Sequence, residues 1–140
     1  MRTMDRWLGD GGMPLLGLLG ATFARYGIDD AGVAWAEADW CPTDLACNPH
    51  GTVQGGVYTV LLDAVMNFAV NTGLDGRDRS RATLEMKTEM MRPALVLAPL
   101  VVRGEVVRMA RQVAFVEGRV RNAENNLVSR ATGTWMLHRE

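Results

Sequence analysis

The residues best suited to chemistry lie in an otherwise apolar stretch, residues 57–70. Asp63 is the only carboxylate in that stretch, and Thr59 and Asn67 lie four residues to either side of it. Residues four apart share one face of an α-helix, so the three would form a polar stripe on an apolar helix. Burying a carboxylate without a partner is costly, so we expect the stripe to face a cleft or another subunit. The structural alternative is that Asp63 bonds a neighbouring strand or pairs with a buried arginine.

Two glycines, Gly55 and Gly56, stand where this helix should begin. They let a ligand approach the backbone closely, and the first N–H groups of a helix have no intrahelical acceptors. With the helix dipole, such groups can hold an anion or a developing oxyanion. The alternative is that the glycines only permit a tight turn into the helix or close packing against a sheet.

The spacing between these two features limits how they can cooperate. Gly55 and Asp63 are eight residues apart, which corresponds to about 12 Å along a helix axis. One carbonyl group cannot contact both, so joint action on one bond requires two chains. Two antiparallel helices in a two-fold dimer would bring each helix start to the other carboxylate. The enzyme hypothesis therefore predicts a homodimer with composite sites.

The rest of the chain must supply the elements that position these residues. Residues 13–19 favour a short helix, residues 32–40 alternate as a strand, and residues 56–71 form the long helix. Four strand-like runs follow, at 82–91, 99–109, 112–120 and 127–137, with a hairpin loop at 122–126. A long apolar helix and a long sheet satisfy each other if the sheet wraps the helix. The pattern predicts an α+β architecture.

Length and composition restrict the class of protein. The chain has 140 residues and no linker-like segment, which predicts a single domain over residues 1–140. A net charge of -1 gives no electrostatic case for nucleic-acid binding. No apolar run reaches the ~20 residues of a membrane span. Residues 13–24 have the length of a signal-peptide core, but the acidic residues before them argue against export, so we expect a cytoplasmic protein.

Cysteine and histidine are too scarce to favour a metal site. Cys41 and Cys47 are the only cysteines, and His50 and His138 are the only histidines. We expect no metal, and we interpret the two cysteines as reduced thiols.

The segment from Asn48 to Asp63 resembles the motif of the hotdog-fold acyl-CoA thioesterases, specifically the phenylacetyl-CoA and hydroxybenzoyl-CoA thioesterase group. That motif has an asparagine or glutamine, a glycine, then His-Gly-Gly, with an acidic residue nine after the histidine. The matching residues here are Asn48, Gly51, Gly55, Gly56 and Asp63. The resemblance extends over nearly the whole chain and implies a hotdog fold, in which an antiparallel sheet wraps a long central helix.

The resemblance also implies roles for single residues. The Gly55 N–H would bind the thioester carbonyl oxygen, with Asn48 supporting the substrate or a water molecule nearby. Asp63 of the partner chain would act as a general base on water or as a nucleophile. Thr83 occupies a strand position where family members often carry a hydroxyl that helps hold the water.

Gln54 departs from the family, which usually has histidine at this position. Glutamine donates a hydrogen bond but cannot act as a base near pH 7. Either the position is structural and glutamine suffices, or the site is altered and activity is weak or lost. We favour the first, because the acidic residue and the glycines are present. The leading interpretation is therefore a thioesterase, and the alternative is a non-catalytic protein that binds acyl-CoA or acyl carrier protein. A dehydratase of the same fold is a third class, but it usually needs a histidine near the helix.

The implied substrate is an acyl-CoA with an aromatic or short to medium acyl group, cleaved to a carboxylic acid and free coenzyme A without another cofactor. Gly56 and Asn67 would contact it. The acyl pocket would be lined by apolar residues: Val57, Val60, Leu61 and Met90. Arg111 is the first choice for binding the coenzyme A phosphates. Further pairing of dimers into a homotetramer is also expected.

Overall fold

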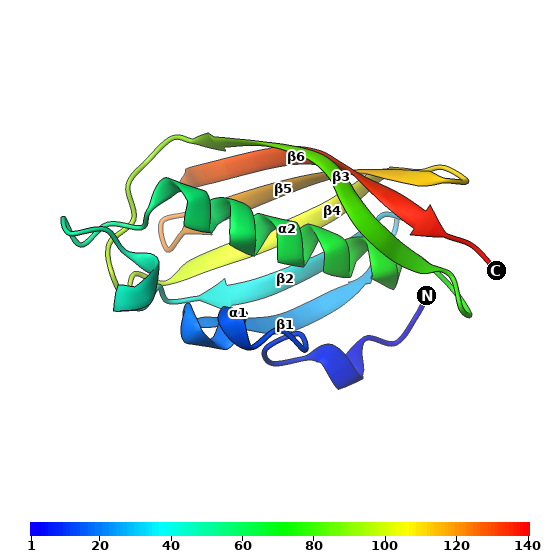
Figure 1. Cartoon of the computed structure of the whole chain (residues 1–140), viewed down its shortest axis with the longest axis horizontal. Coiled ribbons are helices and arrows are strands. Elements are labelled where there is room, and N and C mark those ends of the chain that lie inside the picture. The colour runs from blue at the N-terminus through cyan, green and yellow to red at the C-terminus, as the bar shows by residue number, and fades with distance from the viewer.

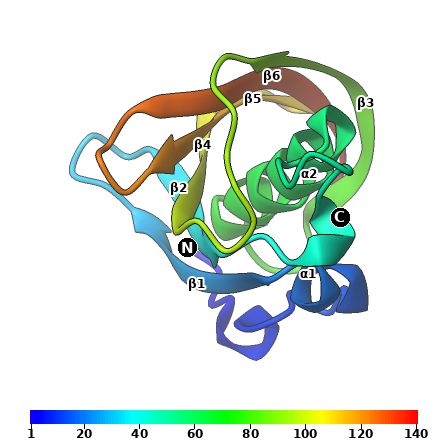
Figure 2. The same cartoon turned by 90° about the vertical axis from the view of Figure 1, so that its left-hand side faces the viewer.

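A curved antiparallel sheet wraps one long helix in the computed structural model, which describes all 140 residues (Figures 1 and 2). The six strands have the order β1-β2-β4-β5-β6-β3. Their bounds are β1 Ala21–Ile28, β2 Ala34–Trp40, β3 Arg79–Met90, β4 Leu100–Met109, β5 Val113–Asn122 and β6 Leu127–His138. The helices are α1 Pro14–Leu18 and α2 Gly55–Thr72, with short 3-10 turns at Asp5–Trp7 and Asp44–Ala46. This is the α+β arrangement that the sequence predicts.

The apolar faces of α2 explain its place inside the sheet. Its fully buried apolar side chains are Leu61, Leu62, Val65, Met66, Ala69 and Val70. Strand glycines let the helix approach closely, because a Cβ added at Gly104 of β4 would lie 2.8 Å from the Met66 Cα. A Cβ at Gly118 of β5 would meet the Met66 sulfur at the same distance. The helix therefore packs closely against β4 and β5, because Gly104 and Gly118 carry no side chain.

Most predicted elements are present, and one strand was missed. The helix at 13–19 is α1, the strand at 32–40 is β2, and the loop at 122–126 joins β5 to β6. The prediction of one strand before the long helix is wrong, because β1 precedes β2 and pairs with it. Its register shifts between Phe23 and Arg25, and such a bulge breaks the alternation on which the prediction relied.

The two edges of the sheet differ. On the β1 edge, Gly9 and Phe23 exchange two backbone hydrogen bonds of 3.0 and 2.7 Å, so the N-terminal segment covers part of that strand. On the other edge, β3 pairs only with β6 along its 12 residues, and none of these residues is buried. The β3 edge is thus free to pair with another strand.

Two further properties bear on the sequence expectations. Cys41 and Cys47 are both free thiols. No helix combines the length and apolar character needed to cross a membrane.

Candidate active site

The predicted polar stripe of α2 faces the inner side of β3. The Thr59 hydroxyl donates to the Thr88 hydroxyl at 2.9 Å, and Ser80 donates to the Asn67 side-chain oxygen at 2.5 Å. The stripe continues one turn further to Asn71, whose amide donates to the Ser80 hydroxyl at 2.9 Å. Polar groups on the helix are therefore matched by polar groups on the edge strand.

Asp63 lies in the middle of this stripe and is only partly buried. The Thr83 hydroxyl donates to Asp63 Oδ1 at 2.7 Å. This bond to a strand is what the structural alternative expects. However, no cation pairs with the carboxylate and its Oδ2 accepts no hydrogen bond from the chain. Thr83 thus orients the carboxylate and leaves one oxygen available.

The Asp63 carboxylate borders a hollow of about 490 Å³ between α1, α2 and β3. The hollow is lined by Met13, Leu15, Val60, Asp63, Ala64, Asn67, Ser80, Arg81, Ala82 and Thr83. Its apolar wall comes from both helices, and its polar wall comes from the stripe and β3. The arrangement can hold an apolar group beside a carboxylate.

The start of α2 offers two unused hydrogen-bond donors. The backbone before it is held in place, because Val53 donates to the Ala94 carbonyl at 2.9 Å and Gln54 donates to the Ala46 carbonyl at 3.0 Å. The N–H groups of Gly55 and Gly56 donate to no acceptor in the chain. Gln54 is the N-cap residue, yet its side chain is exposed and makes no capping bond. The helix start is therefore a fixed pair of free donors.

Gly55 borders a second hollow of about 310 Å³ at the helix start. Its lining residues are Thr52, Val53, Gly55, Tyr58, Met90, Met91, Arg92 and Pro93. None of these residues lines the Asp63 hollow. Within one chain, Gly55 and Asp63 thus serve separate hollows, as their spacing along the helix requires.

Asn48 organises the loop before the helix. Its amide donates to the Thr52 hydroxyl at 2.9 Å, and its Oδ1 accepts the His50 N–H at 3.0 Å. Thr52 borders the hollow at the helix start, whereas Asn48 does not. Asn48 therefore acts on that hollow only indirectly, by holding Thr52. Direct support of a substrate by Asn48 stays a prediction, and His50 is an exposed loop residue, as expected.

The predicted acyl pocket needs one correction. Leu61 is fully buried, because it lies on the side of α2 that packs into the core, so the prediction that it lines a pocket is wrong. Met90 borders the hollow at the helix start and Val60 borders the Asp63 hollow. Val57 is half-buried and packs against the core cluster.

Arg111 lies far from the helix start. It is exposed in the turn between β4 and β5. The last residue of β4, Met109, approaches Gly73 at the other end of α2. Arg111 is therefore at the wrong end of α2 to contact a ligand at Gly55 of the same chain. The role of Arg111 in phosphate binding stays a prediction. Arg92, by contrast, borders the hollow at the helix start.

Some residues of the site were missed from the sequence. Asn71 continues the four-residue spacing of the stripe and was therefore within reach of the same argument. Tyr58 is buried beside Gly55, its hydroxyl makes no hydrogen bond of ordinary geometry, and burial raises its pKa. Ser80 and Thr88 could be identified only once β3 was paired with the helix stripe.

Comparison with known families gives one clear match. A model of the thioesterase superfamily matches residues 50–129, which include Gly55, Asp63 and Thr83. A protein of Saccharolobus solfataricus named “Putative esterase” is 29% identical over 90 residues, 64% of this chain and 58% of that protein. The chain spans about three fifths of the length of the curated relatives it matches.

Solved structures share the fold. A phenylacetic acid degradation-related protein from Ralstonia eutropha JMP134 is 29% identical, with a TM-score of 0.79 over 96% of this chain and 99% of that one. A Bacillus halodurans protein crystallised with CoA is 26% identical, with a TM-score of 0.67 over 73% of this chain and 66% of that one. The predicted fold and the predicted family resemblance are confirmed.

Proposed function

Because this chain belongs to the thioesterase superfamily, we propose that it hydrolyses the thioester bond of an acyl-CoA. The observation that carries this proposal is the Asp63 carboxylate. It borders an open hollow, has one oxygen held by Thr83, and has no cationic partner. A carboxylate placed in this way is available to a substrate or a water molecule.

In the proposed reaction, Asp63 removes a proton from water, and the resulting hydroxide attacks the thioester carbonyl carbon. The carbon–sulfur bond of the tetrahedral intermediate then breaks, and the thiolate of coenzyme A leaves and is protonated. Thr83 keeps the carboxylate oriented toward the water through its hydrogen bond. Direct attack by Asp63, with a mixed anhydride as intermediate, is the other route that the same group offers.

The helix start would stabilise the oxyanion of that intermediate. The N–H groups of Gly55 and Gly56 lack acceptors, and the backbone before them is pinned by the bonds from Val53 and Gln54. Loss of one oxyanion donor typically lowers kcat by about 10²–10³. The exposed Gln54 amide is an additional hydrogen-bond donor next to this position. It takes part in no proton transfer, because Asp63 removes the proton from water in this scheme.

A homodimer would assemble the site. Gly55 and Asp63 border different hollows in one chain, and the free β3 edge lies beside the stripe that contains Asp63. Pairing of β3 with β3 of a second chain would bring the two α2 helices together antiparallel. Each thioester would then lie between Gly55 of one protomer and Asp63 of the other. Pairing of dimers into tetramers stays a prediction.

The substrate class follows from two supports. A relative of this fold binds CoA and another is a phenylacetic acid degradation-related protein. The hollow beside Asp63 has an apolar wall of Met13, Leu15, Val60 and Ala64. We therefore favour an aromatic or short to medium acyl group. No further cofactor takes part in the proposed reaction.

The alternative function is binding of acyl-CoA or acyl carrier protein without turnover. Gln54, which stands where the family usually has histidine, is the observation that favours it. A protein that only binds its ligand would not need the Asp63 carboxylate to be oriented by Thr83.

Thiol release from a panel of acyl-CoAs tests the proposal. Asp63→Asn should lower kcat by about 10²–10⁴, the usual contribution of a general base. Asp75→Asn is the matched control, because that exposed carboxylate pairs only with the N-terminal amine. Sedimentation should show the same oligomer for both variants. Binding of acyl-CoA by the unmodified protein without thiol release would replace the hydrolase by the alternative.

A further inference from the structure

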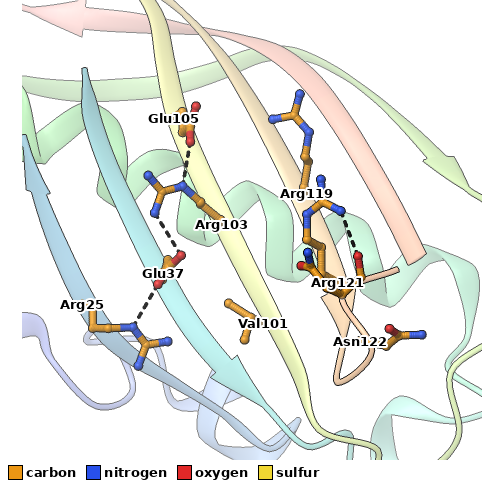
Figure 3. Close-up of a pocket in the computed structure, with 9 residues that line it drawn as sticks. Arg25, Glu37, Val101, Arg103, Glu105, Arg119, Arg121 and Asn122 are labelled. Atoms are coloured by element: carbon orange, nitrogen blue, oxygen red, sulfur yellow. Dashed lines mark hydrogen bonds and ion pairs between the residues drawn. The ribbon is translucent and has the colours of Figure 1, made fainter. Parts of the chain in front are cut away.

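A hollow lined almost entirely by polar residues lies on the outer face of the sheet (Figure 3). Along β4 the side chains of Val102 and Val106 are buried toward the helix. Alternate strand residues point to opposite faces, so Arg103 and Glu105 point away from α2. None of the residues that line this hollow borders the hollows of the candidate active site. The outer hollow is therefore a separate feature, with a volume of about 480 Å³.

One wall of this outer hollow uses its arginines in ion pairs. Arg25 pairs with Glu37 at 2.9 Å and with Asp39 at 2.6 Å. Arg103 pairs with Glu37 at 2.9 Å and with Glu105 at 2.6 Å. Figure 3 shows four of these side chains linked in a row across β1, β2 and β4: Arg25, Glu37, Arg103 and Glu105. The guanidinium donors of this wall are therefore mostly occupied, and with three carboxylates for two arginines the wall adds no positive charge.

The opposite wall has an excess of positive charge. Arg119 and Arg121 are two residues apart on β5 and therefore lie on the same face, about 7 Å apart. Arg119 forms one ion pair, with Glu117 at 3.3 Å. Arg121 pairs with no carboxylate, and its one hydrogen bond goes to the Asn125 carbonyl at 3.2 Å. Arg119 also lies directly opposite Arg103 in the strand register, and like charges in that position repel.

Amide donors at the end of β5 add to this positive wall. The Asn122 Oδ1 accepts the N–H groups of Glu124 and Asn126 at 3.1 and 2.9 Å. Those bonds fix the amide and leave its Nδ2 group without an acceptor. Asn125 also lines the hollow, and its side chain makes no hydrogen bond. The wall thus presents the amide groups of Asn122 and Asn125 beside the guanidinium of Arg121, and its carboxylate, Glu117, is paired with Arg119.

We propose that this outer hollow binds a phosphate-bearing anion, held by Arg119 and Arg121 with help from Asn122. Guanidinium groups bind phosphate oxygens in pairs, and the bonds are charge-assisted. A volume of about 480 Å³ suits a small organic ligand. Val101 lies between the two walls and offers an apolar surface to its organic part (Figure 3).

Two sources of that phosphate are distinguishable. One is a free phosphorylated compound, which would make the hollow a second ligand site. The other is the nucleotide end of coenzyme A, and this source rests on the proposed function. Arg92 of the helix-start hollow donates to the Leu127 carbonyl at 2.8 Å, beside the hairpin that carries Asn122 and Asn125. The two hollows therefore flank one hairpin.

Calorimetric titration with inorganic phosphate and with adenosine 3′,5′-bisphosphate tests the binding itself. Arg119→Gln and Arg121→Gln, separately and together, should weaken both ligands at least tenfold. Arg108→Gln is the matched control, because Arg108 is exposed on β4 and makes no ion pair; its affinities should be unchanged. Equal affinities in all variants, or no measurable binding to the unmodified protein, would overturn the proposal. This readout does not require thioesterase activity.

Acyl-CoA kinetics then identify the source. A rise in KM with unchanged kcat in Arg121→Gln, together with a preference for CoA over dephospho-CoA that this variant loses, assigns the hollow to the substrate nucleotide. An unchanged KM with weakened bisphosphate binding assigns it to a free phosphorylated ligand. Both results support an anion site.

Discussion

The two edge strands of this sheet have opposite characters. On β1, Phe23 is fully buried and stacks on Phe68 of α2 with ring centroids 4.3 Å apart. The N-terminal segment covers this contact, because Gly11 lies so close to Phe68 that a Cβ would clash with its ring. On β3, no residue is buried, and Thr83 and Thr88 contact the helix through hydrogen bonds between polar side chains.

The difference shows how one fold separates stability from chemistry. Apolar stacking closes the β1 edge and anchors the helix there. Polar contacts on the β3 side keep the Asp63 carboxylate accessible, and the open strand edge can recruit a second chain. The carboxylate that we propose meets the substrate thus lies on the side where the sheet edge is open.

The largest expected effect is loss of stability at the closed edge. Phe23→Ala should lower the free energy of unfolding by about 3–5 kcal/mol, because it empties a fully buried aromatic site. Phe115→Ala is the matched control on the outer face of β5, where the ring is 42% exposed; it should cost about 1 kcal/mol or less. Urea unfolding measures both. Similar losses for the two variants would mean that the β1 edge is not held by its buried ring.

A charge on the open edge should weaken association. Leu84 of β3 is 50% exposed and Ile28 of β1 is 39% exposed. Leu84→Lys should raise the dimer dissociation constant at least tenfold, about 1.4 kcal/mol, because it places a charge where the second chain is expected. Ile28→Lys, on the covered edge strand, should leave association unchanged. Analytical ultracentrifugation decides, and a larger effect from Ile28→Lys would move the interface to β1.

Removal of the hydroxyl that holds the carboxylate should slow the reaction. Thr83→Val keeps the side-chain shape but removes the hydrogen bond to Asp63. We expect kcat to fall about tenfold with little change in KM, since a hydrogen bond to a charged group contributes about 1.5 kcal/mol. Thr88→Val is the matched control, because it breaks the neighbouring bond to Thr59. Equal rates for the two variants would exclude a special role for Thr83.

The smallest effect concerns the exposed ion pair beside the closed edge. The hydrogen bond from Arg25 lowers the pKa of Asp39 below its ordinary value of 3.8. The pair therefore stabilises the folded state above that pH, and the contribution is lost as the pH falls through the lower folded-state pKa. Asp39→Asn should cost under about 1 kcal/mol at pH 7, because the pair is exposed. Urea unfolding at pH 7 and at a pH below the folded-state pKa of Asp39 measures this loss. A larger loss of stability at the acid pH would contradict the expected direction of the pH dependence.

The sequence predicted the helix and its stripe well. Both follow from local spacing, since polar side chains four residues apart in an apolar helix lie on the same face. The free N–H donors of Gly55 and Gly56 were also predicted, because the first N–H groups of any helix lack intrahelical acceptors. The strand β1 was missed because a bulge after Phe23 breaks the two-residue repeat.

Residue pairs distant in the chain were harder to predict. Thr83 was singled out by resemblance, and its bond to Asp63 appeared only with the register of β3 against α2. Leu61 was assigned to a pocket although it is in the core. The outer hollow was not expected at all, because it depends on the alignment of β2, β4 and β5.

By itself the sequence determined the central helix, the position of its carboxylate and the donors at its start, because helix geometry relates residues a few positions apart. Only the tertiary structure decided which strand faces that carboxylate, which edge is closed and where arginines gather. Those outcomes depend on strand register and packing between segments that no local spacing relates.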